Sequence, residues 1–351
     1  MSDFTNKKQS RREFLGKSAA FAAAASVLPL SFGCSGPTAT ATKETEGTAD
    51  TSDKPNSIFG GVHIGAITYS FRSMPGGLEN IVKYCKESGI SSIELMSGDL
   101  EQYLGAPENP MMNMPRPAFV PGQPRPQPTP EQRAMMEKYS ADMKAWRTSL
   151  PMSKVEAAKK LLNDAGVFPH IVKFSPARWS DEEIEYAFNV TKAMGAKATT
   201  EEIGVEAAQR LAPFAEKHGI VVGMHNHNQY AEEGFSADPM LAVSPSIKLN
   251  FDPGHYFGST GKHPNDFIRK YHDRIFSIHM KDKTGPTIEG EPNANQVWGQ
   301  GEMPIADVLL LLKKEKWPIY VDIELEYEIK PWSDPVKEVR TCVQYARNIL
   351  I

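Results

Sequence analysis

Short apolar segments alternate with longer amphipathic segments from Gly61 to Ile351. Eight of the apolar segments are rich in β-branched residues, as is typical of parallel strands that are buried on both faces. They span residues 62–71, 91–96, 167–174, 196–201, 220–227, 247–252, 275–280 and 319–326. A segment with helical periodicity follows each one. Eight such strand and helix units predict an α/β fold, a (β/α)8 TIM barrel.

Several of the expected helices have recognisable first residues. Ser153 with Glu156, and Ser180 with Glu183, have the spacing of a capping box. Thr129 precedes a proline, which is typical of a cap followed by the first helical turn.

One insertion, residues 101–150, interrupts the alternation after the second strand. It begins with a Pro- and Met-rich stretch and continues as a polar helix over about 131–147. Loops that follow barrel strands emerge on the face that carries the chemistry. We therefore expect a lid over the substrate, a surface for another subunit of a homo-oligomer, or a solvent-exposed loop.

Residues 1–34 have the features of an export signal. Arg11 and Arg12 lie in SRREFLG, and an alanine-rich apolar run follows over 19–32. A charged segment before a short apolar run is typical of a signal peptide, and paired arginines resemble a twin-arginine signal. A retained membrane anchor is the alternative, although the run is shorter than the roughly 20 residues that a span needs.

Cys34 follows Gly33 in a loose lipoprotein cleavage box, so membrane attachment through a lipidated Cys34 is one expectation. Residues 35–59 are rich in Thr, Ser and Gly and lack apolar periodicity, which predicts a disordered linker. Residues 60–351 are then the barrel. The expected location is outside the cytoplasm, either periplasmic or membrane-anchored.

Cysteine content and charge restrict the class of protein. After Cys34 only Cys85 and Cys342 remain, so no disulfide framework is expected and the domain depends on its core. The formal net charge of the whole chain is −4. The expected leader has a net charge of +3, so the rest of the chain has about −7. Nucleic-acid-binding domains usually carry basic patches, so no nucleic-acid partner is expected.

Candidate metal ligands lie at the ends of the last four strands, in MHNH, NFDPGH, SIHMKD and VDIELE. His225 and His227 are alternate residues of one strand and so point to the same face. The ends of parallel strands meet at one edge of a barrel, which brings these endings together. They supply His225, His227, Asp252, His255, His279 and Glu324.

Imidazole and carboxylate ligands together suit Mn, Zn, Co, Fe or Mg, and not the metals that prefer soft thiolate sites. One such divalent ion would act as a Lewis acid on a sugar carbonyl or hydroxyl. This favours chemistry that begins with enolisation.

From Gly61 to its end the chain resembles the sugar phosphate isomerase/epimerase family, the xylose isomerase-like TIM barrels that also include endonuclease IV. The family's D-x-x-H is matched at 252–255, its H-x-K/N-D at 279–282, its last strand's glutamate at Glu324, and its G-x-G loop within 299–304. The resemblance implies that Asp252, His279 and Glu324 are metal ligands.

The fifth strand departs from the family pattern. Family members usually place there a glutamate that binds the metal and is one of two acid/base carboxylates, and this chain has His225. We expect Glu201, at the end of the fourth strand, to replace it as a ligand beside His227, with Glu202 as the alternative. Epimerisation needs two bases on opposite faces of the substrate. With His225 in place of one carboxylate, the sequence supports simple epimerisation less strongly.

The expected function is that of a metal-dependent sugar isomerase or epimerase, with Glu324 or His225 taking a proton next to a polarised carbonyl. The alternatives are a 3-keto-glycoside lyase or hydratase and a non-catalytic sugar-binding lipoprotein. His255 is expected to contact a substrate hydroxyl, and Lys281 to stabilise an oxyanion. An endonuclease would need histidines after strands two and three, and SSIELMSG and IVKFS contain none. Trp298 is expected to cover a sugar ring. Weaker candidates for the site are Glu94 and Glu326.

Overall fold

The computed structural model of the protein describes residues 54–112, 114 and 127–351. The expected signal peptide, Cys34 and most of the expected linker lie outside the described residues, and so does part of the insertion. The predictions of export and lipidation therefore stay predictions.

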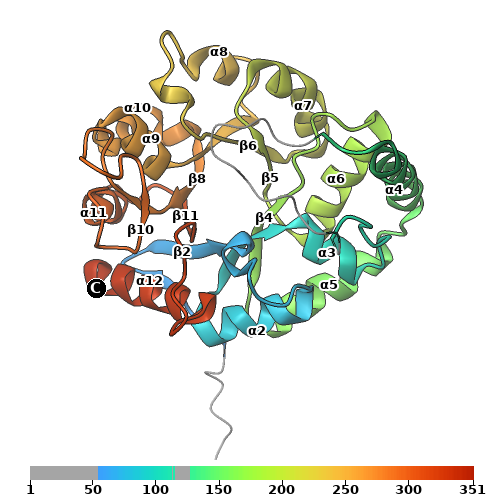
Figure 1. The fold of residues 1–351 in the computed structure, drawn as a ribbon, viewed down its shortest axis with the longest axis horizontal. Coiled ribbons are helices and arrows are strands. Elements are labelled where there is room, and N and C mark those ends of the chain that lie inside the picture. Colours follow the sequence, from blue (N-terminus) through green and yellow to red (C-terminus); the bar gives the residue numbers. More distant parts are fainter. Residues whose placement is uncertain (1–53, 113, 115–126) are drawn as a thin grey trace, which may run out of the picture. The chain divides into compact units, whose positions relative to one another are not determined.

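Eight parallel strands form the barrel, and the pairing of β2 with β3 closes it. Helices surround the strands (Figure 1). The TIM barrel prediction is confirmed, and all eight expected strands are present. They are β2 Val62–Ile67, β3 Ser92–Met96, β4 Phe168–Lys173, β5 Ala198–Glu202, β6 Val221–His225, β7 Ile247–Phe251, β8 Ile275–Met280 and β11 Tyr320–Ile323.

Most helices of the described residues bury apolar side chains against the outer faces of the strands. They are α2 Leu78–Ser88, α3 Ser97–Tyr103, α4 Pro130–Ser149, α5 Ser153–Asp164, α6 Asp181–Met194, α7 Val205–His218, α8 Asp238–Leu241, α9 Pro253–Thr260, α10 Pro264–Tyr271, α11 Ile305–Glu315 and α12 Pro335–Leu350. Short 3-10 turns are η1 Thr68–Phe71, η2 Gln229–Ala231 and η3 His272–Arg274. The first expected strand therefore ends at Ile67, because its last four residues form η1.

Residues 57–59, just before the barrel, are joined to it by hydrogen bonds. β1 (Ile58–Phe59) pairs antiparallel with β2, and the side chains of Ser57 and Ser91 are hydrogen-bonded at 2.9 Å. Of these residues, Ser57, Ile58 and Phe59 belong to the segment that was expected to be the linker.

Two of the three expected helix N-caps are present and one is not. Thr129 and Ser180 cap α4 and α6, and both form capping boxes. Ser153 is instead the first residue of α5, after an N-cap at Met152, and its side chain makes no cap hydrogen bond. The capping box expected at Ser153 is therefore wrong. A serine inside the first turn cannot accept the hydrogen bond that an N-cap side chain accepts.

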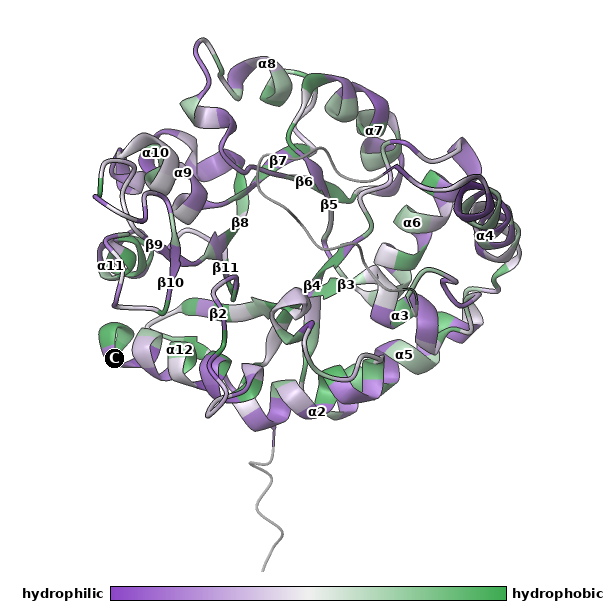
Figure 2. Ribbon diagram, viewed as in Figure 1, coloured by the Kyte–Doolittle hydropathy of each residue, from purple (hydrophilic) through white to green (hydrophobic). Residues whose placement is uncertain are grey.

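The helix of the insertion, α4, packs beside α6 on the outside of the barrel (Figure 1). Arg147 holds it there, since its guanidinium bonds Glu101 at 2.9 Å and Glu183 at 3.1 Å and stacks on Trp179. Most of α4 is hydrophilic (Figure 2), and Met143 is its buried residue. This helix supplies surface outside the helical ring.

The interior of the barrel is polar. Asn250 of β7 donates to Glu94 of β3 at 2.8 Å, and His170 of β4 bonds Asp322 of β11 at 2.8 Å and Ser92 at 2.7 Å. Neither β3 and β7 nor β4 and β11 are neighbours in the sheet, so these bonds cross the barrel interior. Buried polar groups need such partners.

None of the helices in the described residues combines the length and the apolar character needed to cross a membrane.

Candidate metal centre

Four buried side chains converge at the carboxyl ends of the strands. Their ligand atoms all lie within 4.8 Å of one another, so they could hold one metal ion. We call His225, Asp252, His279 and Glu324 the four-residue cluster. They come from the last residue of β6, from β8, and from the positions just after β7 and β11. Parallel strands end at one edge of the barrel, which is why residues up to 99 positions apart in the sequence meet here.

The backbone around Asp252 is fixed from two sides. Asp252 is the N-cap of α9, and its Oδ1 accepts the backbone N–H of His255 at 2.7 Å. The side chain of Asn226 accepts the N–H of Asp252 at 2.9 Å and donates to its carbonyl at 3.1 Å. The ends of β6 and β7 are thereby joined, and Oδ2 of Asp252 remains directed at the cluster.

Glu94 and Glu324 hold the imidazole of His279 from its two sides. Nε2 of His279 lies 2.8 Å from Glu94, and Nδ1 lies 3.1 Å from Glu324. Although burial opposes ionisation, His279 lowers the pKa of Glu94. An ionised carboxylate only accepts hydrogen bonds, so Nε2 carries the proton towards Glu94, and Nδ1 faces the cluster.

The cluster fits a divalent metal ion. Nδ1 of His225 and Oδ2 of Asp252 are buried and make no hydrogen bond, although the ammonium of Lys281 is ion-paired with Oδ2 at 2.8 Å. Burial above all, with the charge of His279 in addition, lowers the pKa of His225 well below its usual value. A neutral imidazole is the form that binds metals. Two imidazoles and two carboxylates suit the borderline divalent ions.

Lys281 lies among carboxylates. Its Nζ is 2.8 Å from Asp252, 2.6 Å from Glu324 and 2.6 Å from Glu326. Burial alone would lower the pKa of Lys281, but the three carboxylates raise it, so Lys281 stays protonated. Its stem crosses α9 at Gly254, where any Cβ would overlap Lys281 Cγ. Only glycine leaves room for the lysine at that point.

The last residue of the H-x-K-D motif supports the G-x-G loop. Oδ2 of Asp282 accepts the backbone N–H groups of Gly299 at 2.7 Å and Gly301 at 3.0 Å. A Cβ on Gly301 would overlap Asp282, and Gly299 has φ +83°. The two motifs are therefore one structural unit, and these N–H groups are already used.

Glu201, expected as a ligand, lies outside the four-residue cluster. Its carboxylate accepts the backbone N–H groups of Ala177 at 2.7 Å and Glu202 at 2.9 Å. His227, also expected as a ligand, is 3.1 Å from the alternative ligand Glu202, and both side chains are about half exposed. The structure thus brings His225, expected to be catalytic, into the cluster in their place.

His255 lies beside the cluster with both ring nitrogens free of hydrogen bonds. It is buried, its Nε2 is 3.5 Å from Glu326, and its ring centroid is 5.0 Å from that of His227. A buried imidazole without partners is suited to contact a bound molecule. The expected contact of His255 with a substrate hydroxyl stays a prediction.

Sequence reasoning missed part of the support of the site. Glu94 was only a weak candidate, and Asn250, which bonds Glu94 and Ser277, was not considered. The sequence signal that could have found Glu94 and Asn250 is that each is a polar residue within an otherwise apolar strand. Trp298 was expected to cover a sugar ring, but it is buried and packs edge-on against Tyr345.

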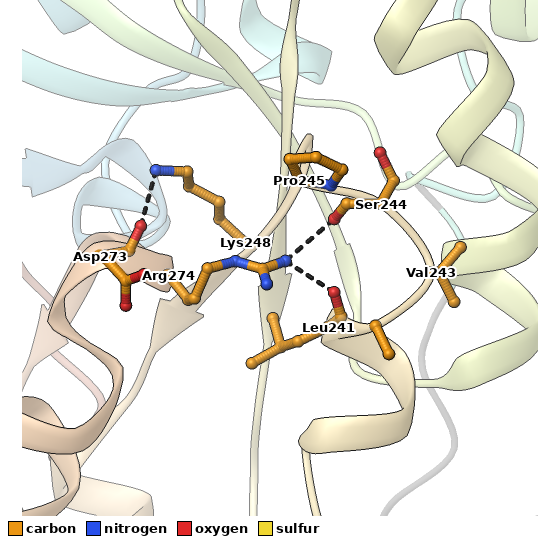
Figure 3. Close-up of a pocket in the computed structure, with 8 residues that line it drawn as sticks. Leu241, Val243, Ser244, Pro245, Lys248, Asp273 and Arg274 are labelled. Atoms are coloured by element: carbon orange, nitrogen blue, oxygen red, sulfur yellow. Dashed lines mark hydrogen bonds between the residues drawn. The ribbon is translucent and has the colours of Figure 1, made fainter.

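A separate pocket of about 450 Å³ lies at the other end of the strands (Figure 3). Lys248 and Arg274, which line it, lie near the first residues of β7 and β8, whereas the cluster lies at the last ones. The guanidinium of Arg274 donates hydrogen bonds to the carbonyls of Leu241 and Ser244 (Figure 3) and so stabilises the loop before β7. This pocket shares no residue with the cluster.

Residues 147–347 match the family described as xylose isomerase-like TIM barrel. No curated protein matches the chain significantly.

Solved structures share the fold at low sequence identity. A sugar phosphate isomerase/epimerase from Parabacteroides distasonis is 16% identical, with a TM-score of 0.51 over 83% of this chain and 96% of its own. The IolI protein with a bound zinc atom is 13% identical, with a TM-score of 0.54 over 82% and 98%. The 3-keto-D-glucoside 4-epimerase YcjR from E. coli is 12% identical, with a TM-score of 0.50 over 82% and 99%.

Proposed function

The chain belongs to the xylose isomerase-like TIM barrel family, and on that premise we propose that it is a divalent-metal-dependent sugar isomerase or epimerase. The observation that carries the proposal is the four-residue cluster, whose buried donor atoms lie within 4.8 Å of one another. Lys281 balances part of the charge of Asp252 and Glu324, and the buried Nδ1 of His225, which makes no hydrogen bond, remains free to bind a metal ion.

His225, Asp252, His279 and Glu324 would hold the metal, which would be Mn, Zn, Co, Fe or Mg. When bound, the ion supplies Lewis-acid polarisation of a sugar carbonyl or hydroxyl. The ligands must be deprotonated to bind it.

Glu324 is suited to accept a proton from the substrate carbon next to the carbonyl. Although burial opposes ionisation, Lys281 and His279 hold the pKa of Glu324 well below its usual range, so it is ionised at neutral pH. Lys281, at 2.6 Å, also stabilises negative charge that develops nearby. His255, with two unpartnered nitrogens, would position a substrate hydroxyl.

The return of the proton from the opposite face would fall to His227. Its hydrogen bond with Glu202 raises the pKa of His227, which favours the protonated ring that an acid requires. Its centroid lies 4.9 Å from that of His225, at the mouth of the barrel.

A second candidate function is a 3-keto-glycoside lyase or hydratase. The carboxylate of Glu201 is engaged by two backbone N–H groups, and His225 takes the place of the usual glutamate. This arrangement has Glu324 as base and His227 as acid, which suits β-elimination as well as epimerisation. A non-catalytic sugar-binding protein would not need the buried cluster.

We further propose that the protein is exported folded by the twin-arginine route, to the periplasm or to a membrane through Cys34. The proposal rests on Arg11 and Arg12 ahead of the apolar run. A metal site loaded in the cytoplasm would cross intact by such a route.

Proton NMR of the metal-loaded protein with ordinary ketoses and 3-keto-glycosides tests the functional proposal. New aldose or epimer signals support the isomerase or epimerase, and loss of the aglycone with an unsaturated ketone supports the lyase. Unchanged spectra with every substrate would contradict both.

A further inference from the structure

A second buried lysine, Lys283, lies next to the cluster. It is 3% exposed and belongs to β9 (Asp282–Lys283), which pairs with β10 (Asn295–Gln296). Its Nζ donates one hydrogen bond, to Oδ1 of Asn295 at 2.9 Å. An ammonium has three protons to donate, so two are left without an acceptor among the described residues.

Lys281 and Lys283 differ in how their charges are balanced. Lys281 is ion-paired with three carboxylates, whereas Lys283 forms no ion pair with any carboxylate of the described residues. Burial foremost, together with the charge of Lys281, lowers the pKa of Lys283. Asp252, Glu326 and Glu324 act on Lys283 only from beyond ion-pair distance and oppose this shift in part. A buried cation without a carboxylate in direct contact is costly, and a bound anion would reduce that cost.

Glycines on α9 make room for both lysines beside the site. Gly254 and Gly258 are one helical turn apart, and a Cβ on Gly258 would lie 2.8 Å from Cε of Lys283, as one on Gly254 would overlap Lys281. His255 lies between these glycines in sequence. Its two nitrogens make no hydrogen bond, and Nε2 is 3.8 Å from Asp252 and 3.5 Å from Glu326. Oδ1 of Asn293 is also buried and unpartnered.

We propose that Lys283, with His255 beside it, binds a carboxylate of the substrate, so that a sugar acid is bound in preference to the corresponding neutral sugar. This inference rests on the proposed function. One ammonium with two free protons matches the two oxygens of a carboxylate. A phosphate would need more donors, and the N–H groups of Gly299 and Gly301 are already used by Asp282.

Calorimetric titration of the metal-loaded protein tests the inference with matched pairs, D-glucuronate against D-glucose and D-galacturonate against D-galactose, and with glucose 6-phosphate. At least one acid should bind on the order of tenfold more tightly than its neutral partner, as a charge-assisted hydrogen bond allows. Lys283→Met should remove this preference and leave the neutral sugar within about twofold of its original affinity.

Two controls complete the experiment. Lys283→Arg keeps the charge and should retain part of the preference, and Lys248→Met, at the other end of the barrel, should retain all of it. Metal content and circular dichroism of each variant report whether it folds.

The inference is overturned if no acid binds more tightly than its neutral partner, if glucose 6-phosphate binds more tightly than both acids, or if Lys283→Met weakens acid and neutral sugar equally. Binding is measured without turnover. An acid preference without any reaction would therefore contradict the proposed function alone, and a reaction without that preference would contradict only this inference.

Discussion

Nε2 of His279 donates a hydrogen bond to the carboxylate of Glu94 at 2.8 Å, across the interior of the barrel. Glu94 is on β3 and His279 is on β8, and these strands are not neighbours in the sheet. The bond sets the tautomer of His279 and turns Nδ1 towards Asp252, His225 and Glu324. Glu94 is thus a positioning residue for a metal ligand.

Glu94→Gln should weaken metal binding about 10-fold to 100-fold, because an amide does not fix the imidazole tautomer as a carboxylate does. Competition with a fluorescent chelator measures the affinity. Glu101→Gln is a matched control outside the barrel interior, where Glu101 bonds Arg147. Equal affinities of Glu94→Gln and wild type would show that Glu94 does not support the site.

His225→Ala should lose the metal, and Glu201→Gln should keep it. His225 offers an unpartnered buried nitrogen to the cluster, whereas both oxygens of Glu201 accept backbone hydrogen bonds. Metal content after dialysis, measured by elemental analysis, distinguishes the two. Loss of metal in Glu201→Gln with retention in His225→Ala would reverse this assignment.

Metal affinity should fall as the pH is lowered, beginning above the usual titration range of histidine. Although burial opposes charging, Glu94 and Glu324 raise the pKa of His279 well above its usual value. The metal must therefore displace a proton from Nδ1, which costs about tenfold in affinity per pH unit below that pKa. Titration calorimetry in buffers of different ionisation enthalpy would detect the released proton. A pH-independent affinity between pH 6 and pH 8 would contradict this coupling.

The cluster could be predicted from the sequence only in part. Asp252 and Glu324 follow strands, and His279 lies near the end of one, so their convergence follows from the barrel alone. The choice between His225 and Glu201 depends on which way the end of β5 faces. In the structure Glu202 is the residue of β5 that pairs in register with His225. Adjacent residues of a strand point to opposite faces, so Glu201 points to the other face of the sheet.

Long-range contacts were the part that sequence patterns could not supply. The bond from His279 to Glu94 joins residues 185 positions apart on strands that are not neighbours. The place of α4 outside the ring depends on one arginine, Arg147, meeting Glu101 and Glu183. Such pairings depend on how the barrel closes and how the helices pack around it, and local periodicity contains neither.

Replacing Arg11 and Arg12 with lysine should keep the protein inside the cell, since the paired arginines are the proposed export address. Fractionation followed by immunoblotting measures the distribution. Lys7 and Lys8, replaced with arginine, serve as a control in the same segment and should leave export unchanged. Export of the double Arg→Lys variant at the wild-type level would contradict the proposal.

Deuterium exchange tests the central claim most directly. In deuterated water the metal-loaded protein should place deuterium on the carbon next to the carbonyl of a recovered ketose or keto-glycoside. Glu324 takes that proton, and the half-exposed His227, whose own proton exchanges with the solvent, returns a deuteron. Glu324→Gln and the chelator-treated protein should incorporate little. Exchange at the wild-type rate in both would contradict the account, since neither the cluster nor its carboxylate would then be needed for the removal of the proton.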